Sequence, residues 1–197
     1  KELGDFKYYL GSHHKIRSQF KKTERPTDFG NKVWATSLVL IKHLQENPFK
    51  FEGLRVLEIG CGWGLLGVYL AKAHSCHVTC TDMDERVLPI VQLHADLNAV
   101  SIKTKQASFG ELKESFLNSF DLIIGAEICY SEEVGREITE LIQRAFKGNV
   151  SHILIADPGR PDFYECHNYC TQHYKAELFE LPASANSKTT KLLSAFN

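Results

Sequence analysis

The chain has little methionine, proline or tryptophan, no long apolar run and no excess of either charge. Its 197 residues include one methionine, six prolines and two tryptophans, and the formal net charge is −1. No apolar run approaches the eighteen or more residues of a membrane-spanning helix, so no membrane association is expected. A charge near zero gives no overall attraction to nucleic acid, and no stable nucleic-acid partner is expected.

The chain also lacks internal repeats, low-complexity tracts and a charged-then-apolar leader, although it begins at Lys1 without methionine. A hydrophobic content of 43% over 197 residues supports one domain with a sizeable core and leaves no room for a second catalytic domain. We therefore expect a monomer, and the absence of a leader favours a cytoplasmic location.

Six cysteines are scattered through the predicted core, and buried reduced thiols are the favoured interpretation. Cys166, His167, Cys170 and His173 are spaced so that they share a helix face, which is compatible with zinc. Structural zinc sites usually draw ligands from two separated segments rather than one helix, so no metal is expected.

The most informative segment joins a short apolar strand to a run of alternate glycines. Residues 55–59 read as a buried strand, and Gly60, Gly62 and Gly64 follow it. Glycine allows the sharp turn into the next helix, lets the backbone approach a ligand, and leaves free amides at the helix start. This pattern predicts a nucleoside-cofactor site on a βαβ unit.

A second strand, 77–82, ends in Asp82, whose carboxylate is placed to accept hydrogen bonds from ribose hydroxyls. Met83 follows it and offers a soft face for an adenine ring. Gly62, Gly64 and Gly67 also spell the dinucleotide fingerprint, which alone is a weak signal. Glu58 argues against a dinucleotide, because its charge would repel a pyrophosphate but would tolerate a cationic sulfonium and ammonium.

Strand and helix patterns alternate along the rest of the chain, which predicts an α/β fold with a doubly wound parallel sheet. The predicted strands are 55–59, 77–82, 102–107, 120–126 and 151–157. The predicted helices are 34–46, 65–73, 85–98, 132–146 and 162–173. Segments 176–181 and 189–196 are expected to form a closing hairpin.

The glycine segment with Glu58 resembles motif I of the class I S-adenosylmethionine-dependent methyltransferases, and Asp82 matches the acidic residue after their second strand. The resemblance implies S-adenosyl-L-methionine as cofactor and a Rossmann-like, seven-stranded sheet, mostly parallel with an antiparallel C-terminal strand. Phe109 stands where the family often places a tryptophan after the third strand, and a phenylalanine can also stack on adenine.

Residues 120–130 resemble the acidic-x-x-aromatic segment that follows strand four in methyltransferase family 16, which includes protein-lysine methyltransferases. Ala126 ends the strand on the cofactor side, and Glu127 and Tyr130 fill the motif, although the family often has aspartate at the first position. Trp34 resembles that family's amino-terminal tryptophan beside the cofactor. The resemblance implies that Glu127 orients a lysine amine and that Tyr130 offers a ring or hydroxyl to the methylated cation.

Residues 157–161 resemble a loop of some members, in which Asp157 and Arg160 are candidates for substrate binding. Asp-Pro-Gly is also a strong turn signal in any protein, and Arg160 could equally form a surface ion pair. Tyr130 could equally be a packing residue at the strand end.

Other functions stay open at this point. The fold serves many substrates, so a small-molecule methyltransferase is the main alternative to N-methylation of a protein lysine. A non-catalytic S-adenosylmethionine-binding module and a nicotinamide-dependent oxidoreductase are further alternatives. Nucleic-acid amino-methyltransferases are expected to carry prolines after strand four, which Glu127 to Tyr130 lack.

Residues 1–33 form a compositionally distinct arm before the domain at 34–197. Its first 32 residues hold eight lysines or arginines against four acidic residues, with interleaved aromatics such as Phe20 and Phe29. The preferred interpretation is a flap that packs over the cofactor cleft through its aromatics, and contact with nucleic acid or an acidic protein is the alternative.

Overall fold

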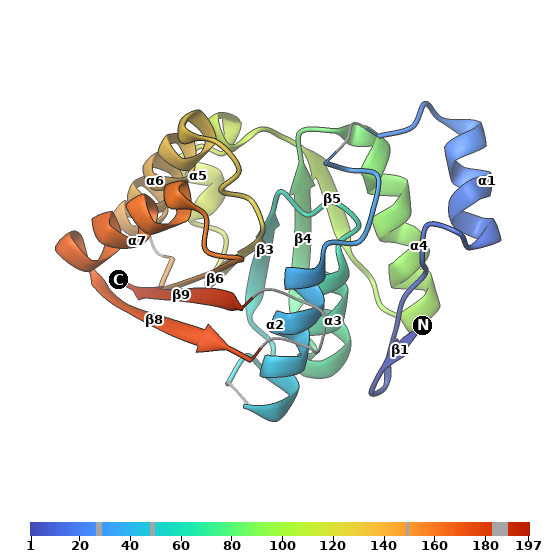
Figure 1. Ribbon diagram of the computed structural model, residues 1–197, viewed down its shortest axis with the longest axis horizontal. Helices are drawn as coiled ribbons and strands as arrows, with labels where there is room; N and C mark the ends of the chain where they lie inside the picture. The colour runs from blue at the N-terminus through green and yellow to red at the C-terminus, as the bar shows by residue number, and fades with distance from the viewer. Residues whose placement is uncertain (27–28, 48–49, 149, 183–188) are drawn as a thin grey trace.

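A single seven-stranded sheet runs through the molecule in the order β5-β4-β3-β6-β7-β9-β8. The computed structural model describes residues 1–197 except 27–28, 48–49, 149 and 183–188. All pairings are parallel except those of β9, which runs antiparallel to both β7 and β8 (Figure 1). The strands are β3 (Arg55–Ile59), β4 (His77–Asp82), β5 (Lys103–Gln106), β6 (Leu122–Ala126), β7 (His152–Asp157), β8 (Lys175–Leu181) and β9 (Thr190–Phe196).

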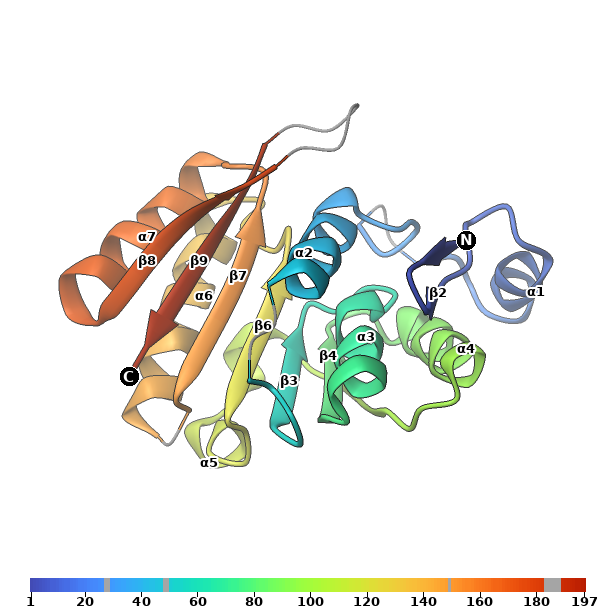
Figure 2. The same cartoon turned by 90° about the horizontal axis from the view of Figure 1, so that it is seen from below.

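Helices cover both faces of this sheet, as Figure 2 shows. α2, α3 and α4 pack on one face and α5, α6 and α7 on the other. The helices are α2 (Ala35–Glu46), α3 (Leu65–His74), α4 (Leu88–Asn98), α5 (Glu114–Leu117), α6 (Glu132–Lys147) and α7 (Pro161–His173), with short 3₁₀ turns η1 (Glu85–Val87) and η2 (Phe109–Glu111).

Successive strand residues divide between the two apolar layers. Val56 and Leu154 contribute to the layer under α2 and α3, whereas their neighbours Leu57 and Ile153 contribute to the layer under α6 and α7. Strands buried on both faces form continuous apolar runs in the sequence, and these runs are the signal that predicted such strands. The predicted α/β fold, with its antiparallel C-terminal strand, is confirmed.

Element boundaries differ from the predictions by a few residues, and the predicted helix 85–98 is divided. It consists of η1 followed by α4, and Pro89 lies in the first turn of α4. Proline has no backbone N–H to donate, so it is tolerated only where a helix begins. No helix in the described part of the chain is long and apolar enough to cross a bilayer.

The amino-terminal arm carries β1 (Glu2–Leu3), β2 (Phe6–Lys7) and α1 (His14–Lys22) and packs beside α4 (Figure 2). Ile16 of α1 is fully buried in a small cluster with Tyr9, Trp63 and Ile90. The Tyr9 amide donates to Nε2 of the buried His94 (3.1 Å), whose Nδ1 lies 3.1 Å from the Trp63 carbonyl oxygen. His94 thereby joins the arm to the glycine-containing loop after β3.

Candidate active site

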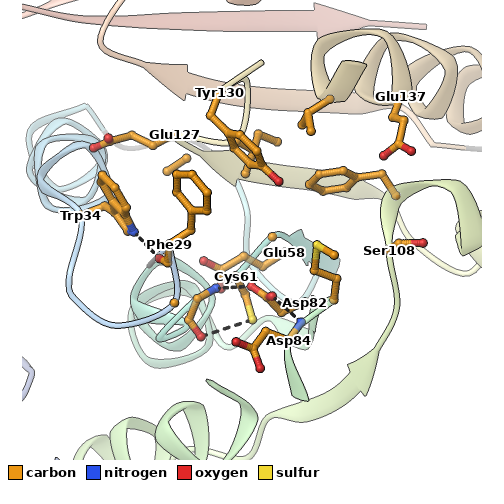
Figure 3. A pocket seen from close by; sticks show the side chains of 18 of the residues that line it. Phe29, Trp34, Glu58, Cys61, Asp82, Asp84, Ser108, Glu127, Tyr130 and Glu137 are labelled. Carbon is orange, nitrogen blue, oxygen red and sulfur yellow. Dashed lines mark hydrogen bonds between the residues drawn. The ribbon is translucent and has the colours of Figure 1, made fainter. Parts of the chain in front are cut away.

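A cavity of about 320 Å³ opens at the carboxyl ends of β3, β4 and β6. Open α/β sheets place their ligand sites at this edge, because the strand order reverses there and leaves a crevice. Figure 3 shows the lining side chains converging from these strands, from the arm and from α6.

The glycine loop forms one wall of the cavity. Gly60, Gly62 and Gly64 all have positive φ angles, of 56°, 50° and 68°. A Cβ added to Gly62 would have no atom within 4 Å, whereas one on Gly60 would lie 2.8 Å from Ile128. Gly62 therefore presents bare backbone to open cavity space, which is the arrangement a closely held ligand requires.

Glu58 lines the cavity at the end of β3 and is otherwise buried. Its carboxylate accepts hydrogen bonds from the Gly67 amide in the first turn of α3 (2.9 Å) and from the Cys80 thiol (3.3 Å). Burial raises the pKa of Glu58 to about 7 despite these donors. The packing also explains Gly67, where a Cβ would lie 2.6 Å from the Glu58 carboxylate.

Asp82 closes the loop from the end of β4. Its two carboxylate oxygens accept from the amides of Gly62 (2.8 Å) and Asp84 (2.9 Å). Burial raises the pKa of Asp82, and the two amides oppose that shift. The carboxylate thus fixes the glycine loop relative to β4, and its oxygens retain lone pairs for a ligand hydroxyl.

Met83 and Phe109 lie beyond Asp82 on the cavity lining, together with Ala107 and Ser108. Met83 is 64% exposed, which is unusual for the only methionine in the chain. A solvent-facing thioether and an aromatic ring on the same lining indicate a binding surface for a flat heterocycle rather than a part of the packed core.

Glu127 occupies a strained position directly after β6. Its φ of +58° lies in the left-handed region, which side-chain-bearing residues rarely adopt. Its amide donates to the Ala156 carbonyl oxygen (2.8 Å), and its Oε1 accepts from the Thr36 amide (3.0 Å) in the first turn of α2. Strained backbone held by such contacts is characteristic of functional sites.

Three aromatic side chains meet beside Glu127 (Figure 3). The rings of Phe29 and Tyr130 are parallel within 16° at a centroid separation of 4.6 Å, and Phe29 also stacks on Trp34 at 6.4 Å. The Trp34 indole N–H donates to the Phe29 carbonyl oxygen (2.7 Å). Burial raises the pKa of Tyr130, and the nearby Asp82 adds to that shift.

The described lining holds six carboxylates and no lysine, arginine or histidine. These are Glu58, Asp82, Asp84, Glu127, Glu133 and Glu137. Glu133 and Glu137 lie one turn apart on α6 and form no ion pair within the described residues, whereas Glu132 and Glu140 on that helix pair with arginines. Asp84 pairs with Arg86 (2.6 Å), and the other acidic groups favour a cationic ligand and disfavour the pyrophosphate of a dinucleotide.

Three of the predicted site residues lie outside the described cavity lining. Gly64 is the N-cap of α3, where a Cβ would lie 2.7 Å from Val91. The fully buried Asp157 accepts from the amides of Gly159 and Arg160 and pairs with the Arg160 guanidinium (2.8 Å). The hydrogen bonds of the Asp157 carboxylate are therefore made within the turn at 157–161. The role of Asp157 and Arg160 in substrate binding stays a prediction.

The structure adds lining residues that the motifs did not indicate, chiefly Phe29, Ser37, Glu133 and Glu137. Glu133 and Glu137 could have been found, since residues four apart on a helix that follows a site strand share one face. Phe29 was expected only as one of several arm aromatics over the cleft, because its contact with Tyr130 joins segments about a hundred residues apart.

A family model described as lysine methyltransferase, methyltransferase family 16, matches residues 15–166. The chain belongs to this lysine methyltransferase family. The match spans the glycine loop, Asp82 and the segment from Glu127 to Tyr130, and it confirms the resemblance found in the sequence.

Curated relatives of this lysine methyltransferase family member are similar over most of the chain. The electron transfer flavoprotein beta subunit lysine methyltransferase of Rattus norvegicus is 27% identical over 153 residues, which are 76% of this chain and 57% of that protein. EEF1A lysine methyltransferase 3 of Xenopus tropicalis is 30% identical over 74% of this chain and 66% of its own length. The chain thus spans somewhat more than half the length of these relatives.

Solved structures share the fold at lower identity. A methyltransferase from Pyrococcus furiosus aligns with a TM-score of 0.66 at 18% identity, over 92% of this chain and 95% of that one. Magnesium protoporphyrin IX methyltransferase from Synechocystis PCC 6803, solved with bound SAH, aligns with a TM-score of 0.59 over 82% of this chain and 81% of that one, at 18% identity.

Proposed function

We propose that the chain is an S-adenosyl-L-methionine-dependent methyltransferase that N-methylates a lysine side chain of a protein. The observation that carries this proposal is a cavity with a bare glycine wall and an aromatic pair, lined by carboxylates without a cation in its described part. A positively charged cofactor and a lysine acceptor both suit such a lining.

The residues present fit the cofactor. Gly62 offers open space at a positive φ, and Asp82 has acceptor oxygens at the β4 end. The residues that would hold the cofactor are Trp34, Glu58, Gly60, Gly62, Gly64, Asp82, Met83, Phe109 and Ala126; all except Gly64 line the cavity, and Gly64 shapes the loop. When bound, S-adenosylmethionine supplies an electrophilic methyl group on a sulfonium.

Glu127 and Tyr130 form the acceptor side. The lysine that enters as an ammonium would first give a proton to solvent, and the lone pair of the neutral amine would then accept the methyl group that the bound cofactor supplies. Glu127 holds the amine by hydrogen bonding, and the Phe29–Tyr130 pair limits water beside it. Catalysis by positioning needs no covalent enzyme intermediate.

Glu133 and Glu137 favour lysine over a neutral acceptor. Their carboxylates, which form no ion pair with a described residue, stand on the α6 side of the cavity and attract a protonated side chain as it approaches. The relatives named above act on proteins, as their names state, which supports a protein substrate for this chain.

We further propose that the protein works as a monomer in the cytoplasm. Its six cysteines are all unpaired and buried, which suits a reducing compartment. No helix of the described residues could span a membrane, which is compatible with that location.

Calorimetric titration with S-adenosylmethionine, S-adenosylhomocysteine and NAD tests the cofactor. Binding of both S-adenosyl compounds without NAD supports the proposal, and NAD binding alone would overturn it. A labelled-methyl assay then separates an enzyme from a binding module, because a module binds the cofactor but transfers no label.

A further inference from the structure

Helix α1 presents an outer surface of cations without acidic partners. Its sequence contains Lys15, Arg17, Lys21 and Lys22 and no acidic residue, and all four side chains are exposed. None of them forms an ion pair with another described residue. We call the exposed side chains of Arg17, Lys21 and Lys22 the α1 basic face.

This face belongs to a packed element rather than a solvated tail. On the inner side of α1, Ile16 is fully buried and Phe20 packs on Trp63, with ring centroids 6.3 Å apart. The Tyr9 amide and His94 fix the segment before the helix. The backbone that carries the cations is therefore held in place, and less backbone entropy is lost when they meet a partner.

The charge pattern of α1 carries a local cost. Arg17 and Lys21 are four residues apart, a like-charge spacing that destabilises a helix by a few tenths of a kcal/mol, although Lys21 and Lys22 in the last turn interact favourably with the helix dipole. On α6, by contrast, Arg136 and Arg144 each pair with a glutamate at that spacing. The chain thus uses such pairs elsewhere and leaves α1 without them, which favours a role for the basic face outside the fold.

The α1 basic face and the cavity are connected by a short stretch of chain. Phe29, Gly30 and Trp34 line the cavity, and six residues lie between Lys22 and Phe29. That stretch reaches at most about 25 Å when fully extended. A ligand segment of modest length can therefore contact α1 and the cavity together.

We propose that the α1 basic face is a docking surface for an acidic segment of the protein substrate, which lies on the order of 25 Å from the methylated lysine. This rests on the proposed function, since it assigns the substrate's flank to the same site. The two surfaces have opposite signs: a cationic lysine enters the acidic cavity while acidic residues nearby meet α1. Nucleic acid fits poorly, because its phosphates would approach six carboxylates.

The test compares matched charge variants. The docking variant combines R17Q, K21Q and K22Q. The control variant combines K50Q, K72Q and K103Q, which remove the same charge near the amino ends of the strands, away from the cavity. None of the three control lysines forms an ion pair with a described residue.

Two dye-labelled peptides of about twenty residues serve as probes, each with one lysine and with either five glutamates or five glutamines about eight residues away. Anisotropy with protein saturated in S-adenosylhomocysteine measures binding without turnover. We expect the acidic peptide to bind wild type and control about tenfold more tightly than the docking variant, with the difference lost at about 0.5 M salt. Equal binding by docking variant and wild type, or an equal loss in the control, would overturn the docking surface.

Methyl transfer to the same peptides separates this proposal from the function it rests on. We expect the glutamate flank to lower KM in wild type but not in the docking variant, with kcat unchanged. Equal KM for both peptides in wild type would overturn the docking surface, whereas tight acidic binding without methylation would count against the function alone. A single-stranded oligonucleotide that binds the α1 basic face more tightly than the acidic peptide would assign the surface to nucleic acid and overturn the proposal.

Discussion

Glu127 has a structural and a chemical role that substitutions can separate. Its carboxylate caps the amino end of α2 through the Thr36 amide, and it also lines the cavity. Loss of a helix-capping acceptor costs about 1 kcal/mol. At φ +58°, alanine keeps the left-handed strain of about 1–2 kcal/mol, which glycine relieves. We therefore expect E127A to lower the free energy of unfolding by about 1 kcal/mol and E127G to stay within about 1 kcal/mol of wild type.

Both variants should lose methyl-transfer turnover by about a hundredfold, because both remove the group that positions the amine. S-adenosylhomocysteine affinity should change by less than about tenfold, since the hydrogen bonds of Glu127 go to Thr36 and Ala156 rather than to the glycine loop or Asp82. Urea unfolding, calorimetry and initial rates of labelled methyl transfer measure the three quantities. E127Q, which keeps an acceptor oxygen, is the control for the cap.

The outcomes distinguish the two roles. If turnover followed stability, with E127G active and E127A inactive, backbone strain at this position rather than the carboxylate would account for the loss of activity. Wild-type turnover in both variants would show that the acceptor is positioned by other groups.

Three further changes probe the cofactor side and the fold. D82A removes the acceptor for the Gly62 amide and should weaken S-adenosylhomocysteine binding at least about tenfold by calorimetry; unchanged affinity would place the ribose side elsewhere. Because burial raises the pKa of Glu58 to about 7, affinity for cationic S-adenosylmethionine should rise between about pH 6 and pH 8 as the carboxylate ionises, and E58Q should flatten that profile; an equal slope in E58Q would assign it to another group. Burial lowers the pKa of His94 to about 4, so the folded state favours the neutral ring. The free energy of unfolding should therefore be highest above pH 6.5 and should fall by up to about 3 kcal/mol as the pH drops toward 4. Urea unfolding should show that H94Q loses less stability than wild type as the pH falls. Some loss should remain in H94Q, because burial also lowers the pKa of His152 to about 4. The same loss of stability in H94Q and wild type would exclude His94 as a cause.

The fold and the cofactor side could be predicted because their signals are local. The glycines after β3 have positive φ values that few other residues accept, and Asp82 ends the alternating strand β4 about twenty residues later. Strands buried on both faces are visible as apolar runs, such as Leu122 to Gly125.

The acceptor side could be predicted only in part, because its contacts join distant segments. Glu127 was assigned from a family motif, but its bond to Thr36 spans 91 residues and has no local signature. Phe29 was seen only as one of several arm aromatics. Asp157 and Arg160 show the converse, since a local turn accounts for the contacts that the structure gives them.

The most direct test of the account is to identify the amino acid that receives the methyl group. The protein is incubated with S-adenosylmethionine carrying a tritiated methyl group and a cell lysate, and the labelled proteins are hydrolysed and chromatographed. The G62R variant, whose side chain would fill the cavity beside the glycine loop, is the control. The account predicts label in methyllysine with wild type and none with G62R. Label in methylarginine, in methylhistidine or only in small molecules would contradict it.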